Sequence, residues 1–174
     1  MVDFLRHASR HVHATVAKHV KAGLTELDWT DPANTPLGAP AVRFQTTTAL
    51  QGGKLGSGVG AGLVSIVLGN ELMPDPEELG GPLFRQDYPF FIDLFMETDG
   101  EATALACDIR DILLGRFEFA GRTLPVVDQV TSTPVPGWLI EFEDVERMSP
   151  DHTFSIQWQV VKVTASTYYN EVVY

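Results

Sequence analysis

The feature that most constrains the fold is a buried strand followed directly by a helix, within residues 88–116. Large apolar side chains occupy both the even and the odd positions of Tyr88–Glu97, so both faces of a strand formed by this segment would be covered. One face carries Phe90, Ile92, Leu94 and Met96, and the other carries Phe91 and Phe95 on either side of Asp93. The segment therefore reads as a buried strand.

The helix that follows has a signal at each end. Thr98 and Glu101 fit a capping box, in which the hydroxyl and the carboxylate each accept a hydrogen bond from the other residue's amide. Gly115 supplies the residue that turns left-handed after the last turn. The residues between form one apolar stripe, made of Ala102, Leu105, Ala106, Ile109, Ile112 and Leu113. We expect this helix to cover the inner face of the sheet.

Composition indicates one domain over residues 1–174, with ordinary shares of apolar residues (44%) and charged residues (20%) for a globular protein. No run approaches the roughly 20 apolar residues that a membrane span needs, so no membrane is expected. The one cysteine, Cys107, allows no intramolecular disulfide, which favours an intracellular folding compartment.

The net charge of −11 is unevenly distributed. Residues 1–21 carry +3 and the rest carries −14. Binding to nucleic acid depends on Lys and Arg that neutralise phosphates, so the balance argues against a general nucleic-acid binder. It suits a protein that lies near DNA without gripping it, or a basic helix that docks on an acidic neighbouring surface.

The basic segment predicts a first helix from Asp3 to about Gly23 or Leu24. Its apolar face consists of Leu5, Val12, Val16 and Val20, flanked by Ala8 and Leu24. His7 and His11 are four residues apart, but no third ligand follows at a useful spacing, so we predict no metal. We expect the histidines to form a polar helix face with partly charged imidazoles. Trp29, just beyond, either anchors the following loop on the core or is held for a neighbour.

Residues 41–50 and 61–68 read as two antiparallel strands joined by a long glycine-rich β-hairpin, with a mobile loop at 51–60. The loop is not a phosphate-binding P-loop, because Lys54 precedes the Gly56–Gly58 segment and a strand follows instead of a helix. No dinucleotide fingerprint opens a helix there either. We expect the loop to become ordered against a partner.

The second half predicts strands at Thr123–Thr131, at Trp138–Phe142 with a wet acidic face, and at Phe154–Val160. At Val161 and Val163 the apolar residues move from even to odd positions, which indicates a β-bulge at the end of the last strand. The aromatic tail, residues 167–174, packs either on its own sheet or on a partner. The order of elements predicts an α+β fold, with a mainly antiparallel β-sheet packed by an N-terminal helix and a central helix.

No catalytic set emerges from the sequence. His152 lies beside Asp151 in an expected turn, and Cys107 lies in the middle of a helix with no activating base. We therefore predict a protein that is not an enzyme and has no cofactor. Thr103, Cys107 and Leu114 form a second, partly apolar patch on the central helix, which faces either another subunit or the rest of the same fold.

The layout resembles the tail terminator proteins of long-tailed bacteriophages, the group that includes the terminator of phage lambda. The matching features are the basic first helix, the loop at Gly52–Gly58, Glu78–Gly80 ahead of Tyr88–Asp93, the helix from Ala102 to Leu113, and Trp158–Val161 in the closing strands. The match covers most of the chain in layout. The long loop and the extended tail would be additions to a minimal terminator.

The resemblance implies a homo-oligomeric ring of six copies that caps the tail tube, stops its polymerisation and offers a surface to the head–tail connector. Its partners would be other copies, the tail tube protein and the connector protein, with DNA passing through the lumen without specific binding. The location would be the tail or neck of the virion, after assembly in the host cytoplasm. The alternative is another neck or tail-completion component, such as a connector or a tube-like subunit.

The expected partner interface combines the basic helix face, the glycine-rich loop, the second patch of the central helix and the tail. Its residues are Arg6, Arg10, Lys18, Gly53, Lys54, Leu55, Cys107, Leu114, Tyr168, Tyr169 and Tyr174.

Overall fold

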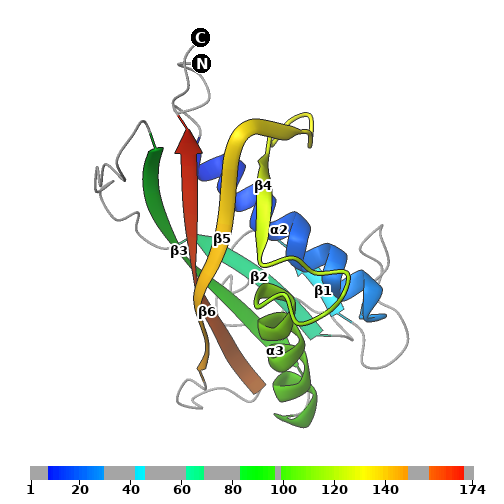
Figure 1. The fold of residues 1–174 in the computed structure, drawn as a ribbon. Coiled ribbons are helices and arrows are strands. Elements are labelled where there is room, and N and C mark those ends of the chain that lie inside the picture. Colours follow the sequence, from blue (N-terminus) through cyan, green and yellow to red (C-terminus); the bar gives the residue numbers. More distant parts are fainter. Residues whose placement is uncertain are drawn as a thin grey trace.

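A computed structural model describes residues 8–29, 42–45, 62–68, 83–96, 99–148 and 157–170. Within these residues the chain forms two helices and six strands, and the predicted α+β class with a mainly antiparallel sheet is confirmed (Figure 1). In chain order the elements are α2 (Ala8–Glu26), β1 (Val42–Gln45), β2 (Gly62–Leu68), β3 (Leu83–Met96), α3 (Asp99–Leu113), β4 (Thr123–Val127), β5 (Pro134–Met148) and β6 (Gln157–Asn170).

The six strands form one sheet in the order β1-β2-β3-β6-β5-β4. The longest pairing joins β3 to β6 in an unbroken antiparallel register, from Leu83 opposite Asn170 to Met96 opposite Gln157. The last strand of the chain therefore lies in the middle of the sheet. Residues 167–170 of the expected tail pair with β3 on one side and, as far as Tyr169, with β5 on the other. This part of the tail packs on its own sheet, and residues 171–174 lie outside the described residues.

The expected β-hairpin between the first two strands is wrong. β1 pairs with β2 in parallel, with Val42 opposite Gly62 and Gln45 opposite Ser65. Parallel neighbours run in the same direction, so the chain must return to the starting end of the sheet between them, which a hairpin turn cannot do. Residues 51–60 themselves lie outside the described part of the chain.

α3 begins at Asp99, directly after the predicted cap Thr98, which is outside the described residues. Its end is confirmed: Gly115 has a φ of +66°. The Gly115 amide donates to the Ile112 carbonyl (3.0 Å) and the Arg116 amide to the Asp111 carbonyl (2.9 Å), which is a Schellman motif. A Cβ at Gly115 would also come within 2.8 Å of the Arg122 backbone nitrogen, so glycine is needed for space as well as for conformation.

α2 continues to Glu26, beyond the predicted end at Gly23 or Leu24. Gly23 does not end the helix. It gives room to α3, because a Cβ there would lie 2.6 Å from Cδ1 of Ile112. The turn comes at Asp28, whose φ is +58°, and the Trp29 amide then donates to the Leu24 carbonyl at 2.9 Å.

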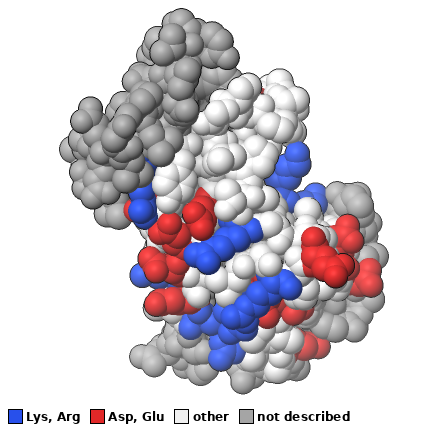
Figure 2. Space-filling model, viewed as in Figure 1, with Lys and Arg blue, Asp and Glu red and all other residues white. Residues whose placement is uncertain are grey.

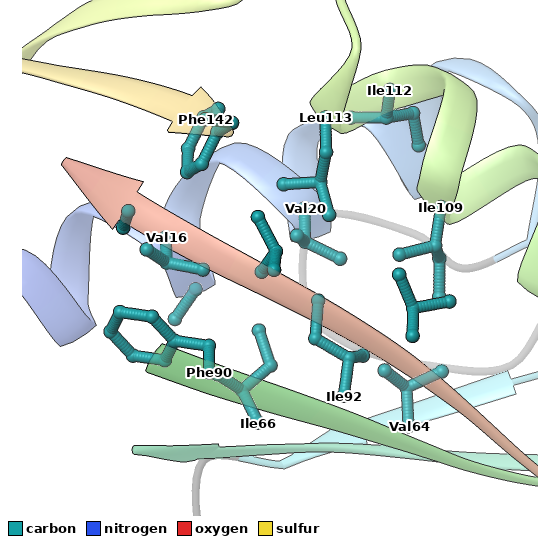
Figure 3. Close-up of a cluster of buried hydrophobic side chains, with 14 of the residues drawn as sticks. Val16, Val20, Val64, Ile66, Phe90, Ile92, Ile109, Ile112, Leu113 and Phe142 are labelled. Atoms are coloured by element: carbon teal, nitrogen blue, oxygen red, sulfur yellow. The ribbon is translucent and has the colours of Figure 1, made fainter. Parts of the chain in front are cut away.

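Both helices lie on the same face of the sheet, and the core fills the space between the two layers (Figures 1 and 3). The predicted apolar stripes of both helices are buried there, with Val16 and Val20 of α2 and Ile109 and Ile112 of α3 fully covered. From the sheet, Val64, Ile66, Phe90, Ile92 and Phe142 point into the same space (Figure 3).

The strands of the second half differ from the prediction in length and in the position of the bulge. β4 ends at Val127, because residues 128–132 form a turn, and β5 extends through Met148. The register with β6 shifts between Glu143 and Glu146, where β5 has one more residue than β6. Asp144 in this bulge has a φ of +48°. The bulge predicted at Val161 of β6 is therefore wrong, because the bulge lies on β5. β6 keeps a regular register with β3, and its apolar residues change from one face to the other at Val161 without a bulge.

Candidate interaction surface

The sheet has a second face, on the side away from the two described helices, on which Ser166 and Val160 are buried and other side chains are exposed. Cross-strand partners point to the same side, so the register shows which residues share this face. They form rows across β5, β6 and β3. The rows are Leu139–Tyr168–Arg85, Glu141–Ser166–Asp87, Glu143–Thr164–Pro89, Glu146–Lys162–Phe91 and Met148–Val160–Asp93. We call this surface the open sheet face.

A network centred on Arg85 joins the three strands on the open sheet face. The Arg85 guanidinium donates to Asp87 at 3.1 Å, to Glu143 at 3.0 Å and to the Ser166 hydroxyl at 3.4 Å. It also lies 5.9 Å from the centre of the Tyr168 ring, and the Tyr168 hydroxyl donates to Glu143 at 3.3 Å. These contacts fix the side chains of neighbouring strands relative to one another.

The pKa values in the network reflect this arrangement. The hydrogen bond to Asp87 is the main cause that raises the pKa of Arg85 above its usual value, so the guanidinium stays charged. Burial is the main cause that raises the pKa of the Tyr168 phenol, which therefore remains a hydrogen-bond donor at neutral pH. Around the network, five carboxylates share the face with two basic side chains, giving it a net charge of −3.

Large apolar side chains are exposed on the same face. Five are exposed in the described residues, and three of them, Phe91 (37%), Leu139 (46%) and Met148 (46%), lie on the open sheet face. They lie in the first, fourth and fifth of the rows, among the charged groups of the face. Apolar and charged side chains occur together in protein interfaces.

The three described histidines of α2 contact other elements of the fold and do not form one polar helix face. His11 is 4% exposed, and its Nδ1 accepts a hydrogen bond from the Gln129 amide at 2.9 Å. Nε2 of His13 lies 3.2 Å from the Ile66 carbonyl oxygen. His19 stacks on Phe142 with ring centres 5.4 Å apart, and burial lowers the pKa of its imidazole. His11 and His13 thus contact backbone groups of the turn after β4 and of β2, whereas His19 packs on Phe142 and its Nε2 is buried without a hydrogen-bond partner.

A turn at residues 128–133, between β4 and β5, is held by many hydrogen bonds. The Asp128 carboxylate accepts from the amides of Val130 and Thr131, both at 2.8 Å, and these bonds are the main cause that lowers the pKa of Asp128. The Asp128 amide donates to the Thr133 carbonyl at 2.8 Å. Nζ of Lys18 reaches from α2 to the Ser132 carbonyl at 3.2 Å. The tip residue, Val130, is 82% exposed. The turn therefore presents an apolar side chain on a rigid support.

The outer edge of β4 is closed to another strand. The carbonyl of Arg122 accepts from the Phe142 amide of β5, so by alternation Thr123, Pro125 and Val127 direct their backbone groups outward. Pro125 has no amide hydrogen, and the Val127 amide donates to the Thr15 hydroxyl of α2 at 2.9 Å. A proline and a covered amide are both devices that prevent strand addition at a sheet edge.

Trp29 anchors the chain on the core, as predicted by the first of the two alternatives given for this residue. It is 8% exposed, and its Nε1 donates to the Asp108 carboxylate of α3 at 2.8 Å. The side of α3 that carries Asp108 thus meets the rest of the same fold. Cys107 and Leu114 on this helix are half-buried.

The structure places the other expected interface residues as follows. Arg10 and Lys18 are exposed on α2, Tyr168 belongs to the Arg85 network, and the backbone of Tyr169 pairs within the sheet. Five expected residues lie outside the described part of the chain: Arg6, Gly53, Lys54, Leu55 and Tyr174.

Sequence reasoning missed Arg85, Asp87 and Val130. The alternation of Arg85 and Asp87 ahead of Tyr88 was a signal that the strand begins earlier and that its outer face is charged.

The charges on the face seen in Figure 2 are interspersed, without a broad patch of either sign. Among the described residues, no three His, Cys, Asp or Glu side chains gather in a way that could hold a metal ion. The two described helices are too short or too polar to span a membrane. No protein-family model matches the sequence, and no curated protein matches it either.

Proposed function

We propose that this protein is a structural subunit of a phage tail, a tail terminator that forms a ring on the end of the tail tube. The ring stops polymerisation of the tube and offers a surface to the head. In this role the chain acts through contacts with other copies, with the tube protein and with the connector, and it performs no catalysis. The layout of helices and strands that resembles the terminators is the basis of the proposal.

The observation that carries the proposal furthest is the open sheet face. In a two-layer fold the outer face of the sheet is normally solvated and polar. Here the outer face exposes Phe91, Leu139 and Met148 around a network of fixed charged groups. Apolar side chains on a rigid surface can be desolvated in a contact with little loss of conformational entropy, which favours a permanent assembly.

The charge also supports a ring around DNA. The chain has a net charge of −11, so a lumen lined by such subunits would repel phosphate and let DNA pass. The expected basic residues of α2 are available for contacts between proteins, because Arg10 and Lys18 are both exposed.

Electron microscopy of the purified protein and of a phage that lacks its gene tests the proposal. We expect ring-shaped particles of several times 19.1 kDa, and mutant tails of uncontrolled length that fail to join heads. Mutant tails of normal length would refute a terminator. Tails of normal length that stay separate from filled heads would instead indicate the alternative, a connector or another neck component.

A further inference from the structure

We propose that the subunits contact one another head to tail, with α2 and the turn at residues 128–133 of one copy docked on the open sheet face of the next. This inference rests on the proposed ring and names the contact that would build it. The first surface, which we call the basic knob, consists of Arg10, Lys18 and the tip residue Val130.

The basic knob is preorganised by the contacts described above. Lys18 donates to the Ser132 carbonyl, and His11 accepts from the Gln129 amide, so α2 and the turn form one rigid unit. Val130, at 82% exposure, is the most exposed of the large apolar side chains in the described residues. A rigid unit that combines the apolar tip of the turn with the exposed cations of α2 fits a partner with an apolar and acidic surface.

The open sheet face has that chemistry. Its carboxylates outnumber its basic groups. The exposed Glu146 is two residues before the exposed Met148 on β5, and Lys162 separates it from the exposed Phe91 on β3. Glu141 adds a carboxylate next to Leu139 along β5. Val130 of one copy can therefore bury itself against apolar side chains of the neighbouring copy, while Arg10 and Lys18 face its carboxylates.

The positions of the two surfaces decide the symmetry. The basic knob belongs to the helix layer, and the open sheet face is on the opposite side of the sheet. A contact between two different surfaces is heterologous, and such contacts give a closed ring or an open filament, in contrast to a two-fold dimer. Strand addition at β4 is excluded as the route, because Pro125 and the covered Val127 amide close that edge.

Charge reversal at both surfaces tests the contact by sedimentation velocity, with circular dichroism to confirm folding. Arg10→Glu/Lys18→Glu and Glu141→Lys/Glu146→Lys should each weaken self-association at least about 10-fold, because each places like charges opposite one another. The chain that carries all four substitutions should associate again, since the charges are then exchanged. Arg110→Glu/Arg116→Glu, in the last turn of α3 and just after it, changes the net charge as much as the first variant and should leave association unchanged.

The inference is overturned if the fourfold variant does not regain association, if the control weakens it equally, or if the wild-type chain stays a monomer up to its solubility limit. Val130→Asp provides a second measurement, because a residue this exposed can change without unfolding the protein. It should weaken association as the charge reversals do, and unchanged association would contradict the contact. Tail length in the gene deletion is independent of these results, so the proposed function can stand where this contact fails.

Discussion

Replacement of Gly23 by alanine separates two opposite physical effects at the contact between the helices. In the middle of a helix, alanine is more favourable than glycine by about 0.8–1 kcal/mol, because glycine loses more backbone entropy on folding. The new Cβ, however, would lie 2.6 Å from Cδ1 and 2.8 Å from both Cγ1 and Cγ2 of Ile112. Ile112 is fully buried in the core, so it has little room to move.

Overpacking of a core costs about 1–3 kcal/mol, which exceeds the gain in helix propensity. We therefore expect Gly23→Ala to lower the free energy of unfolding by about 1 kcal/mol, and the melting temperature by about 2–4 °C for a chain of this size. Ile112→Ala alone should cost about 2–5 kcal/mol through loss of apolar contact and the cavity left behind. It also removes the three atoms that the new Cβ would meet.

The sign of the Gly23→Ala effect should consequently reverse in the Ile112→Ala background, where it should stabilise by up to about 1 kcal/mol. Urea unfolding of the four chains measures the coupling. Gly100→Ala on α3 is the control, because nothing lies within 4 Å of the added Cβ, and it should not destabilise. Stabilisation by Gly23→Ala in the wild-type chain, or an equal effect in both backgrounds, would refute the close packing of α2 on α3.

Three further predictions concern single residues. Burial lowers the pKa of His19 below its usual 6.5, against a smaller opposite effect of a hydrogen bond with the Ile112 backbone, so the neutral form is favoured in the folded state. Its contribution to stability is complete above pH 6.5 and is lost as the pH falls below that value; thermal melts between pH 7.5 and 5.5 should show a smaller loss for His19→Phe than for the wild-type chain. Trp29→Phe removes the donor to Asp108 and should cost about 1.5 kcal/mol, whereas an unchanged urea midpoint would show that the bond does not link the loop to α3. Phe142→Ala should cost about 3–5 kcal/mol by opening a cavity in the core, and a cost below 1 kcal/mol would contradict its full burial.

Several features could be predicted from the sequence because short-range patterns encode them. The apolar stripes of α2 and α3, the left-handed Gly115 and the alternation of Trp138, Ile140 and Phe142 all depend on residues within a few positions of one another. The physical cause is local: side-chain periodicity matches helix or strand geometry, and only glycine fits the crowded turn after α3.

The residues of the proposed contact could be predicted only in part. Lys18, Arg10 and Tyr168 were expected at an interface, and the structure shows Arg10 and Lys18 exposed on α2 and Tyr168 in contact with Arg85. Arg85, Asp87 and Val130 were missed, since their meaning depends on which strands are neighbours and on which turn is rigid. No pattern along the chain brings Arg85 and Glu143 together across β6.

The sequence by itself determined which segments form helices or strands and which of their sides are apolar, but not the bounds of each element. The tertiary structure alone decided that β1 and β2 are parallel, that β6 lies in the centre of the sheet, and that the bulge belongs to β5. It also decided that His11 of α2 is buried. The reason is that packing between segments far apart in the chain sets strand partners and burial. One local sequence pattern is compatible with several such packings.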